Sequence, residues 1–151
     1  LGLRALNVTD DFIVKSRNRA PIWPKNIVGS ISHTSTKALA AIGLKGDFQY
    51  VGVDIESIIT KSDYINILDL ILVKTEHKWL TRNKELWLTI IFSAKESLYK
   101  ALYPSIKCFL NFSNPSVCFL IYSELNKFSS TITFIIEFKR ATSDPGLNCN
   151  I

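Results

Sequence analysis

One stretch of this chain, from Glu85 to Tyr103, limits what it can fold into more than any other. It reads ELWLTIIFSAKESLYKALY, with apolar residues at helical spacing nearly all the way round the helix and Pro104 directly after it. A helix of this kind is buried by neighbouring elements. We expect Pro104 to end the helix, because proline lacks the amide hydrogen that a helix interior uses. The stretch therefore predicts one long central helix covered by the rest of the fold.

Two charged residues interrupt this helix and share one of its faces. Glu96 and Lys100 stand four residues apart, an interval at which glutamate and lysine commonly form an ion pair on a helix surface. An ordinary surface ion pair is therefore one interpretation. In a buried helix, however, a carboxylate needs a partner that compensates for its lost hydration. The second interpretation is that Glu96 and Lys100 belong to a functional site.

Two further carboxylates follow a β-rich run. The stretch YVGVDIES, residues 50–57, places Asp54 and Glu56 two positions apart at the end of a strand, so that both side chains project from one face. Carboxylates side by side repel each other, and a shared cation, a shared proton or full hydration relieves the repulsion. Together with Glu96, they would supply three oxygen ligands of the kind that Mg²⁺ prefers.

The remaining pattern predicts a mixture of helices and strands. Residues 27–44 read as a strand, a polar turn and then a helix or a second strand. A helix is expected to begin with Ser62 or Asp63 as its N-cap. Residues 117–125 and 130–140 are rich in β-branched and aromatic residues and are joined by a polar stretch, which is typical of an antiparallel hairpin.

Composition narrows the class of protein. A chain of 151 residues with 47% hydrophobic and 21% charged residues is typical of one folded domain. Its formal net charge of +5 favours anionic partners, which include phosphorylated cofactors, acidic proteins and nucleic acid. The three cysteines have no metal-ligand spacing and no signal peptide is visible, which indicates a cytoplasmic protein. The apolar runs are too short to cross a bilayer.

A polar turn lies where it could extend the proposed metal site. The turn GSISHT, residues 29–34, offers hydroxyls, backbone amides and His33 to an anion. Lys100, one helical turn beyond Glu96, would meet an oxygen of the same anion. Taken alone, the acidic pair is more often a solvated strand end and His33 an ordinary turn residue. Together these residues predict a site for a metal ion and a phosphate.

Four blocks in this order resemble one known family, the 4′-phosphopantetheinyl transferases, and within it the type that serves enterobactin and related siderophore synthesis. The blocks are RAPIWP, GSISHT, VGVDIE and FSAKESLYKAL, which span residues 19–102. The resemblance implies a reaction in which the phosphopantetheine arm of coenzyme A moves to a serine of an apo carrier protein. It also implies a cytoplasmic, monomeric enzyme that uses Mg²⁺ and does not act on nucleic acid.

The resemblance implies roles for individual residues. Asp54, Glu56 and Glu96 match the magnesium ligands, and Glu96 or a water that it orients would accept the proton of the attacking serine. Lys100 matches the lysine that binds a coenzyme A phosphate. Ser32 and His33 match the turn at the nucleotide end of coenzyme A, and Arg19 matches a basic loop residue near that nucleotide.

The resemblance implies an α+β fold of antiparallel sheets and packed helices, with two lobes related by a pseudo-twofold axis. Residues 1–49 would form the remainder of the first lobe and residues 50–151 the second, with the lobes meeting near Asp47 to Tyr50. The opening LGLRALN looks like the end of a helix, so we expect the first lobe to be incomplete.

Two other functions would account for part of the sequence. A nucleic-acid-binding module would account for the net positive charge and the tryptophans, but the basic residues are dispersed along the chain. A metal-dependent phosphodiesterase or nuclease would use the same three carboxylates, but it leaves the RAPIWP loop without a role. Both fit the sequence less well than the transferase.

Overall fold

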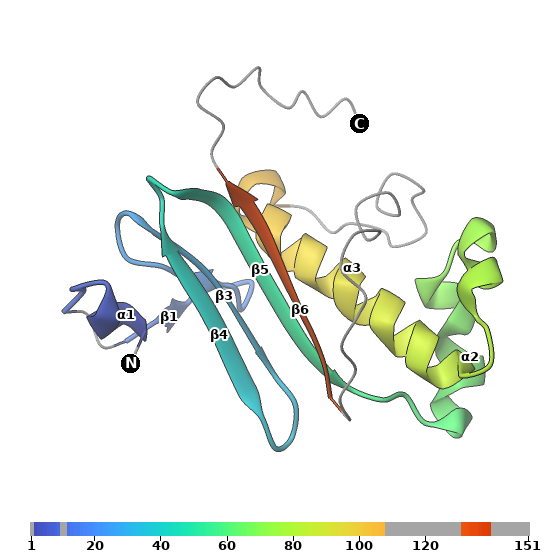
Figure 1. Ribbon diagram of the computed structural model, residues 1–151. Helices are drawn as coiled ribbons and strands as arrows, with labels where there is room; N and C mark the ends of the chain where they lie inside the picture. The colour runs from blue at the N-terminus through green and yellow to red at the C-terminus, as the bar shows by residue number, and fades with distance from the viewer. Residues whose placement is uncertain (1, 10–11, 108–130, 140–151) are drawn as a thin grey trace.

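The computed structural model describes residues 2–9, 12–107 and 131–139 (Figure 1). It combines helices with antiparallel pairs of strands, so the predicted α+β class is confirmed. The elements in chain order are α1 (Gly2–Ala5), β1 (Val14–Lys15), β2 (Pro21–Ile22), β3 (Ile27–His33), β4 (Ala38–Leu44), β5 (Phe48–Ser57), α2 (Lys61–Ile71), the 3₁₀ helix η1 (Lys74–Trp79), α3 (Lys84–Ile106) and β6 (Thr131–Lys139).

The strands form three antiparallel pairs, β1 with β2, β3 with β4, and β5 with β6. Residues 27–44, for which the sequence left a helix or a strand open after the turn, form the hairpin of β3 and β4. Thr34 closes its turn, because the Thr34 amide donates to the Lys37 carbonyl at 2.8 Å. Of the hairpin predicted near the C-terminus, residues 117–125 lie outside the described residues, while β6 pairs with β5.

Serine hydroxyls join the two larger strand pairs where β3 lies beside β5 (Figure 1). The Val53 amide donates to Ser30 Oγ at 3.1 Å, and the Ile55 amide donates to Ser32 Oγ at 3.3 Å. Both serines are buried. The hydroxyls of β3 therefore provide acceptors for the backbone of β5, and they hold the strand that carries Asp54 against β3.

Helix α3 crosses β5 at Gly52, and the missing side chain of this glycine allows the close approach. A Cβ there would overlap the carbonyl oxygen of Ser97 and would lie 2.8 Å from the Cβ of Ala101. Most of the middle of α3 is buried, as its apolar pattern predicts. Gly52 therefore brings α3 close enough for its side chains to reach Asp54 on the same strand.

Two predicted helix boundaries are wrong. Helix α3 continues past Pro104 to Ile106, and Lys107, with φ of 50°, closes it by donating its amide to the Tyr103 carbonyl at 2.9 Å. A proline so near the end removes only one backbone hydrogen bond, so the last turn can form. Helix α2 is capped by Thr60, whose side chain accepts from the Asp63 amide at 3.2 Å, and not by Ser62 or Asp63.

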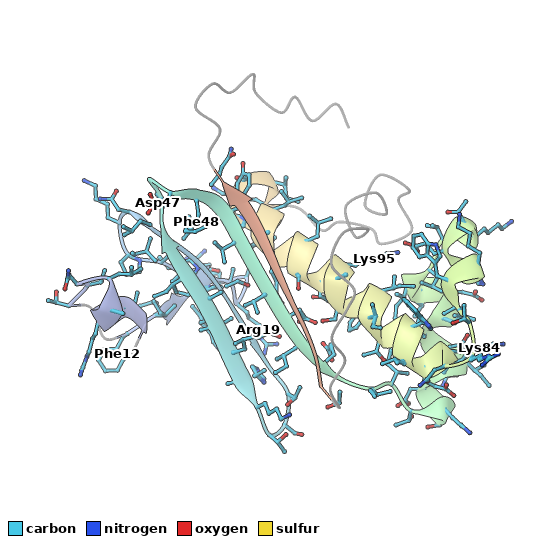
Figure 2. All side chains as sticks on the ribbon, in the orientation of Figure 1. Phe12, Arg19, Asp47, Phe48, Lys84 and Lys95 are labelled. Carbon is cyan, nitrogen blue, oxygen red and sulfur yellow. The ribbon has the colours of Figure 1, made fainter. Side chains whose placement is uncertain are left out.

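Besides the crossing at Gly52, a buried apolar cluster packs the N-terminal half of α3 against α2 and η1. Its buried apolar residues are Ile71, Leu72, Leu88 and Ile91. Beside them Lys95, on α3 (Figure 2), donates to Glu76 Oε2 at 2.6 Å and to the Ile71 carbonyl at 2.7 Å. The side chains of Lys95 and Glu76 are both fully buried. Among the described residues, no helix is long and apolar enough to span a membrane.

The close approach at Gly52 predicts a large effect of one added methyl group. We expect Gly52→Ala to lower the free energy of unfolding by about 2–3 kcal/mol, because overpacking forces α3 away from β5. Urea denaturation of the two proteins measures this difference. Gly46→Ala is the matched control, since a Cβ at Gly46 meets no atom within 4 Å and its φ is not positive. Equal losses in the two variants would contradict the proposed crossing.

Candidate active site

Asp54 is the centre of the candidate site, and its carboxylate is almost completely buried, with 1% exposure. Oδ1 accepts from the Ser32 hydroxyl at 2.8 Å and from the Lys100 ammonium at 2.6 Å. Oδ2 accepts from the Ser93 hydroxyl at 2.8 Å. The donors come from β3 and α3, so the carboxylate on β5 joins three elements. These hydrogen bonds compensate for the hydration that Asp54 loses on burial.

Lys100 forms its ion pair with Asp54, 46 residues away in sequence, and donates to Ser32 Oγ at 2.9 Å as well. Its side chain is 27% exposed. The sequence suggested Glu96, four residues away on the same helix, as its partner. The positive charge of Lys100 still acts on Glu96, since it opposes the rise in the pKa of that carboxyl.

The other two predicted metal ligands have raised pKa values. Burial is the largest cause for Glu56, followed by the negative charge of Asp54, and together with smaller effects they raise its pKa from 4.5 to about 7. For Glu96, burial again raises the pKa most, and the charge of Asp54 adds to it. Lys100 lowers the pKa of both. The three carboxyls therefore share one electrostatic environment with Lys100.

The structure nevertheless does not bring Asp54, Glu56 and Glu96 into a ready-made metal site. Across residues 2–9 and 12–107, no three histidine, cysteine or acidic side chains are grouped so that they could hold a metal ion. The donor set itself suits Mg²⁺, because it consists of carboxylates whose mutual repulsion a divalent cation would relieve. Asp54 also forms a hydrogen bond with Glu56, and this contact contributes to the raised pKa of Glu56.

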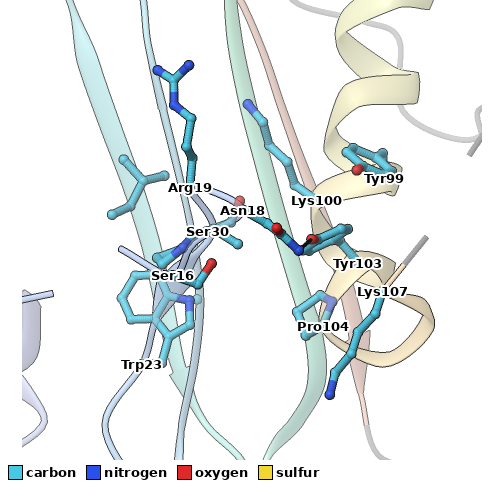
Figure 3. Close-up of a pocket in the computed structure, with 14 residues that line it drawn as sticks. Ser16, Asn18, Arg19, Trp23, Ser30, Tyr99, Lys100, Tyr103, Pro104 and Lys107 are labelled. Atoms are coloured by element: carbon cyan, nitrogen blue, oxygen red, sulfur yellow. Dashed lines mark hydrogen bonds between the residues drawn. The ribbon is translucent and has the colours of Figure 1, made fainter. Parts of the chain in front are cut away.

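A pocket of about 480 Å³ lies next to this network, between the loop before β3 and the last turns of α3 (Figure 3). Trp23 forms one wall and packs on Gly29, where a Cβ would lie 2.7 Å from the indole ring. Asn18 donates to the Tyr103 hydroxyl at 3.3 Å across the pocket. The cationic side chains that line it are Arg19, Lys100 and Lys107.

The residues predicted to bind coenzyme A divide between two places. Arg19 and Lys100 line the pocket, and Figure 3 shows both side chains extending toward the same end of it. Ser32 and His33 are not among its lining residues. Ser32 is buried in the Asp54 network. His33 is exposed at the end of β3, with Nδ1 3.4 Å from the Thr34 carbonyl.

Several residues of the site were not found by the sequence reasoning. Ser93 carries a signal that could have found it, because it precedes Lys100 by seven residues and so shares its helix face. Trp23 belongs to the RAPIWP block, but the sequence pattern assigned no role to it. Tyr103 and Lys107 carry no local signal, since only the path of the loop across the end of α3 makes them pocket residues.

Two family profiles match this chain. One, described as the 4′-phosphopantetheinyl transferase superfamily, covers residues 50–141, and the other, described as the 4′-phosphopantetheinyl transferase N-terminal domain, covers residues 2–43. The first alone spans more than half of the chain. The chain belongs to the 4′-phosphopantetheinyl transferase superfamily.

Individual transferases agree with this assignment. The 4′-phosphopantetheinyl transferase Npt of Nocardia iowensis is 34% identical over 123 residues, which are 80% of this chain and 54% of Npt. Enterobactin synthase component D of Escherichia coli K12 is 41% identical over 86 residues, 55% of this chain and 40% of that protein. The transferase PptT of Mycobacterium tuberculosis is 30% identical over 122 residues, 79% of this chain and 53% of PptT. The chain thus spans about half the length of these relatives or less.

The raised pKa of Glu56 predicts how the stability of this chain depends on pH. The folded protein holds the Glu56 proton up to a pH of about 7, whereas the unfolded chain releases it near 4.5. Stability should therefore fall as the pH rises between these values. We expect Glu56→Gln to flatten this part of the profile, measured by urea denaturation in EDTA at a series of pH values.

Asp69→Asn removes an exposed carboxylate on α2 and serves as the control. It should keep the slope of the unmodified protein. If Glu56→Gln showed that same slope as well, the raised pKa of Glu56 would be wrong.

Proposed function

We propose that this protein transfers the 4′-phosphopantetheine arm of coenzyme A to a serine of an apo carrier protein. The observation that carries the proposal is the position of Lys100, which lines the basic pocket and also contacts the acidic group around Asp54. A pyrophosphate bound at this junction would have cations on one side and metal-binding carboxylates on the other. Transfer of a phosphoryl-linked group needs both, together with a proton acceptor.

The pocket suits coenzyme A as the donor substrate. Its volume is within the range of small-molecule sites. Arg19, Lys100 and Lys107 would bind the phosphates of coenzyme A through charge-assisted hydrogen bonds. Trp23 and Tyr103 offer aromatic surface on which a base can stack. The pocket also accounts for the RAPIWP loop, which forms one of its walls and for which a nuclease offers no role.

Asp54, Glu56 and Glu96 are the residues that would hold Mg²⁺. The ion, when bound, would neutralise the negative charge that develops on the pyrophosphate as the serine attacks. Glu96, or a water that it orients, would accept the proton of that serine. The raised pKa of Glu96 suits this role, because a more basic carboxylate accepts a proton more readily.

We further propose a two-lobed arrangement of the chain and a biosynthetic role for it, both of which the family suggests. Residues 1–49 and 50–151 would form two lobes related by a pseudo-twofold axis, which is supported by separate family profiles for residues 2–43 and 50–141. The acceptor would be an acyl, peptidyl or aryl carrier protein. The likeness to enterobactin synthase component D supports a role in siderophore or other nonribosomal peptide synthesis. The enzyme would act as a monomer in the cytoplasm.

Mass spectrometry of the carrier protein tests this function directly. Incubation of the chain with coenzyme A, Mg²⁺ and an apo carrier protein should add one phosphopantetheine group to one serine. Asp54→Asn should lower the rate by about a hundredfold or more, because it removes a metal ligand while it keeps the size of the side chain. Asp69→Asn should leave the rate unchanged. A rate in Asp54→Asn equal to that of the unmodified chain would contradict the metal assignment.

Lys100 should contribute to coenzyme A binding. We expect Lys100→Met to weaken the affinity for coenzyme A by about tenfold or more, since a charge-assisted hydrogen bond to phosphate is lost. Calorimetric titration of coenzyme A in the presence of Mg²⁺ measures this change. Lys84→Met removes the same charge from the opposite end of α3 (Figure 2) and should leave the affinity unchanged. Equal affinities in all three proteins would show that the pocket is not the coenzyme A site.

A further inference from the structure

Lys100 reaches both parts of the proposed site with one ammonium group. It lines the pocket, yet its Nζ lies 2.6 Å from Asp54 Oδ1 and 2.9 Å from Ser32 Oγ. Two of its three N–H donors are thus used inside the protein. The ammonium is bound to the acidic side of the junction, and its partly exposed stem borders the pocket.

The same contact limits how Asp54 can bind a cation. Oδ1 already accepts two hydrogen bonds, from Ser32 and Lys100, which occupy both of its lone pairs. Oδ2 accepts from Ser93. A divalent ion bound to Oδ1 would also lie within a few ångströms of the Lys100 ammonium, where two positive charges repel strongly in a largely buried site. The ion and the ammonium therefore exclude each other from this oxygen.

We propose that Lys100 is an internal counter-ion of Asp54 that competes with the divalent cation, and that binding of the cation moves the ammonium from Asp54 toward the anionic ligand of the pocket. This inference rests on the proposed function, since it takes Asp54 to be a ligand of the metal. It gives Lys100 two roles that alternate. Lys100 stabilises the buried carboxylate until the metal replaces it, and it then has its donors available for a phosphate.

The contact explains why the three carboxylates do not converge although their residue types suit Mg²⁺. Lys100 partly satisfies the negative charge of Asp54, and it lowers the pKa of Glu56 and Glu96 through the same charge. Lys100 thus performs part of the task that a single divalent ion could perform.

The test is the affinity for Mg²⁺ alone, measured by calorimetry without coenzyme A, at about pH 8.5 so that Glu56 is mostly ionised. We expect Lys100→Met to bind Mg²⁺ about tenfold more tightly or better than the unmodified chain, because the competing cation is gone. Lys100→Arg keeps the charge and should retain the lower affinity. An unchanged or weaker affinity in Lys100→Met would overturn the inference.

Lys107→Met distinguishes the effect of direct contact with Asp54 from the effect of removing a positive charge elsewhere in the pocket. It removes the same charge from the same pocket, but Lys107 is not among the hydrogen-bond donors of Asp54. Its affinity for Mg²⁺ should therefore change much less than that of Lys100→Met. Equal gains in the two variants would show that net charge alone sets the affinity, and the proposed competition would be wrong.

Loss of the counter-ion could also destabilise the fold, so thermal unfolding in EDTA and in Mg²⁺ provides a second readout. Lys100→Met should gain more in melting temperature from Mg²⁺ than the unmodified chain does, in line with tighter binding to the folded state. If the variant is unfolded in EDTA, Mg²⁺ should restore its folding transition, and failure to restore it would overturn the inference.

The outcomes also distinguish the inference from the proposed function. Tighter Mg²⁺ binding by Lys100→Met, together with no carrier-protein transfer by the unmodified chain, would support the competition and contradict the transferase activity of the chain. Transfer by the unmodified chain with equal Mg²⁺ affinities in both proteins would support the function and overturn the competition. Absence of Mg²⁺ binding in every variant would overturn the metal site and the inference together.

Discussion

The burial of Asp54 is the constraint on which the arrangement of β3, β5 and α3 depends. An ionised carboxylate that is removed from water costs several kcal/mol unless charged and polar groups replace its hydration. Ser32, Ser93 and Lys100 supply these groups, and they come from two elements that are far apart in sequence. The three elements must therefore keep their relative positions to within hydrogen-bond distance, and Gly52 makes the necessary approach of α3 possible.

Helix α3 connects this acidic network to the basic pocket. Ser93 and Lys100 contact Asp54, while Tyr103, further along the same helix, and Lys107, directly after it, line the pocket. A rigid helix thus sets the spacing between the proposed metal ligands and the groups that would hold a phosphate. Such rigidity matters for group transfer, because the reacting atoms must be held in line and at a fixed distance.

The buried pair of Lys95 and Glu76 holds the other side of α3. Lys95 is adjacent to Glu96, and its ammonium joins α3 to η1 and to the carbonyl of Ile71 at the end of α2. Removing one member of such a pair leaves an uncompensated buried charge and typically costs about 3–5 kcal/mol. Lys95 on the one hand, and Ser93 and Lys100 on the other, thus belong to separate polar networks. The rotation of α3 that presents Glu96 is therefore determined from both sides.

The spacing of apolar residues along the sequence was enough to predict several helices and strands. It predicted the strand that carries Asp54 and Glu56 and the long buried helix, because side-chain periods of 2 and 3.6 residues reflect which faces are covered. The helix boundaries were less accurate. Thr60 caps α2, and α3 passes Pro104, since one lost hydrogen bond near a helix end is a small cost.

Only the tertiary structure decided which side chains and strands pair with each other. The sequence placed Glu96 near Lys100 by helical spacing, but Lys100 pairs with Asp54, which β5 brings to the same face of α3. The pairing of β6 with β5 and the burial of Ser32 likewise depend on segments that are distant along the chain. The identity of a charged residue is local information, whereas the charge that it meets depends on how the elements pack.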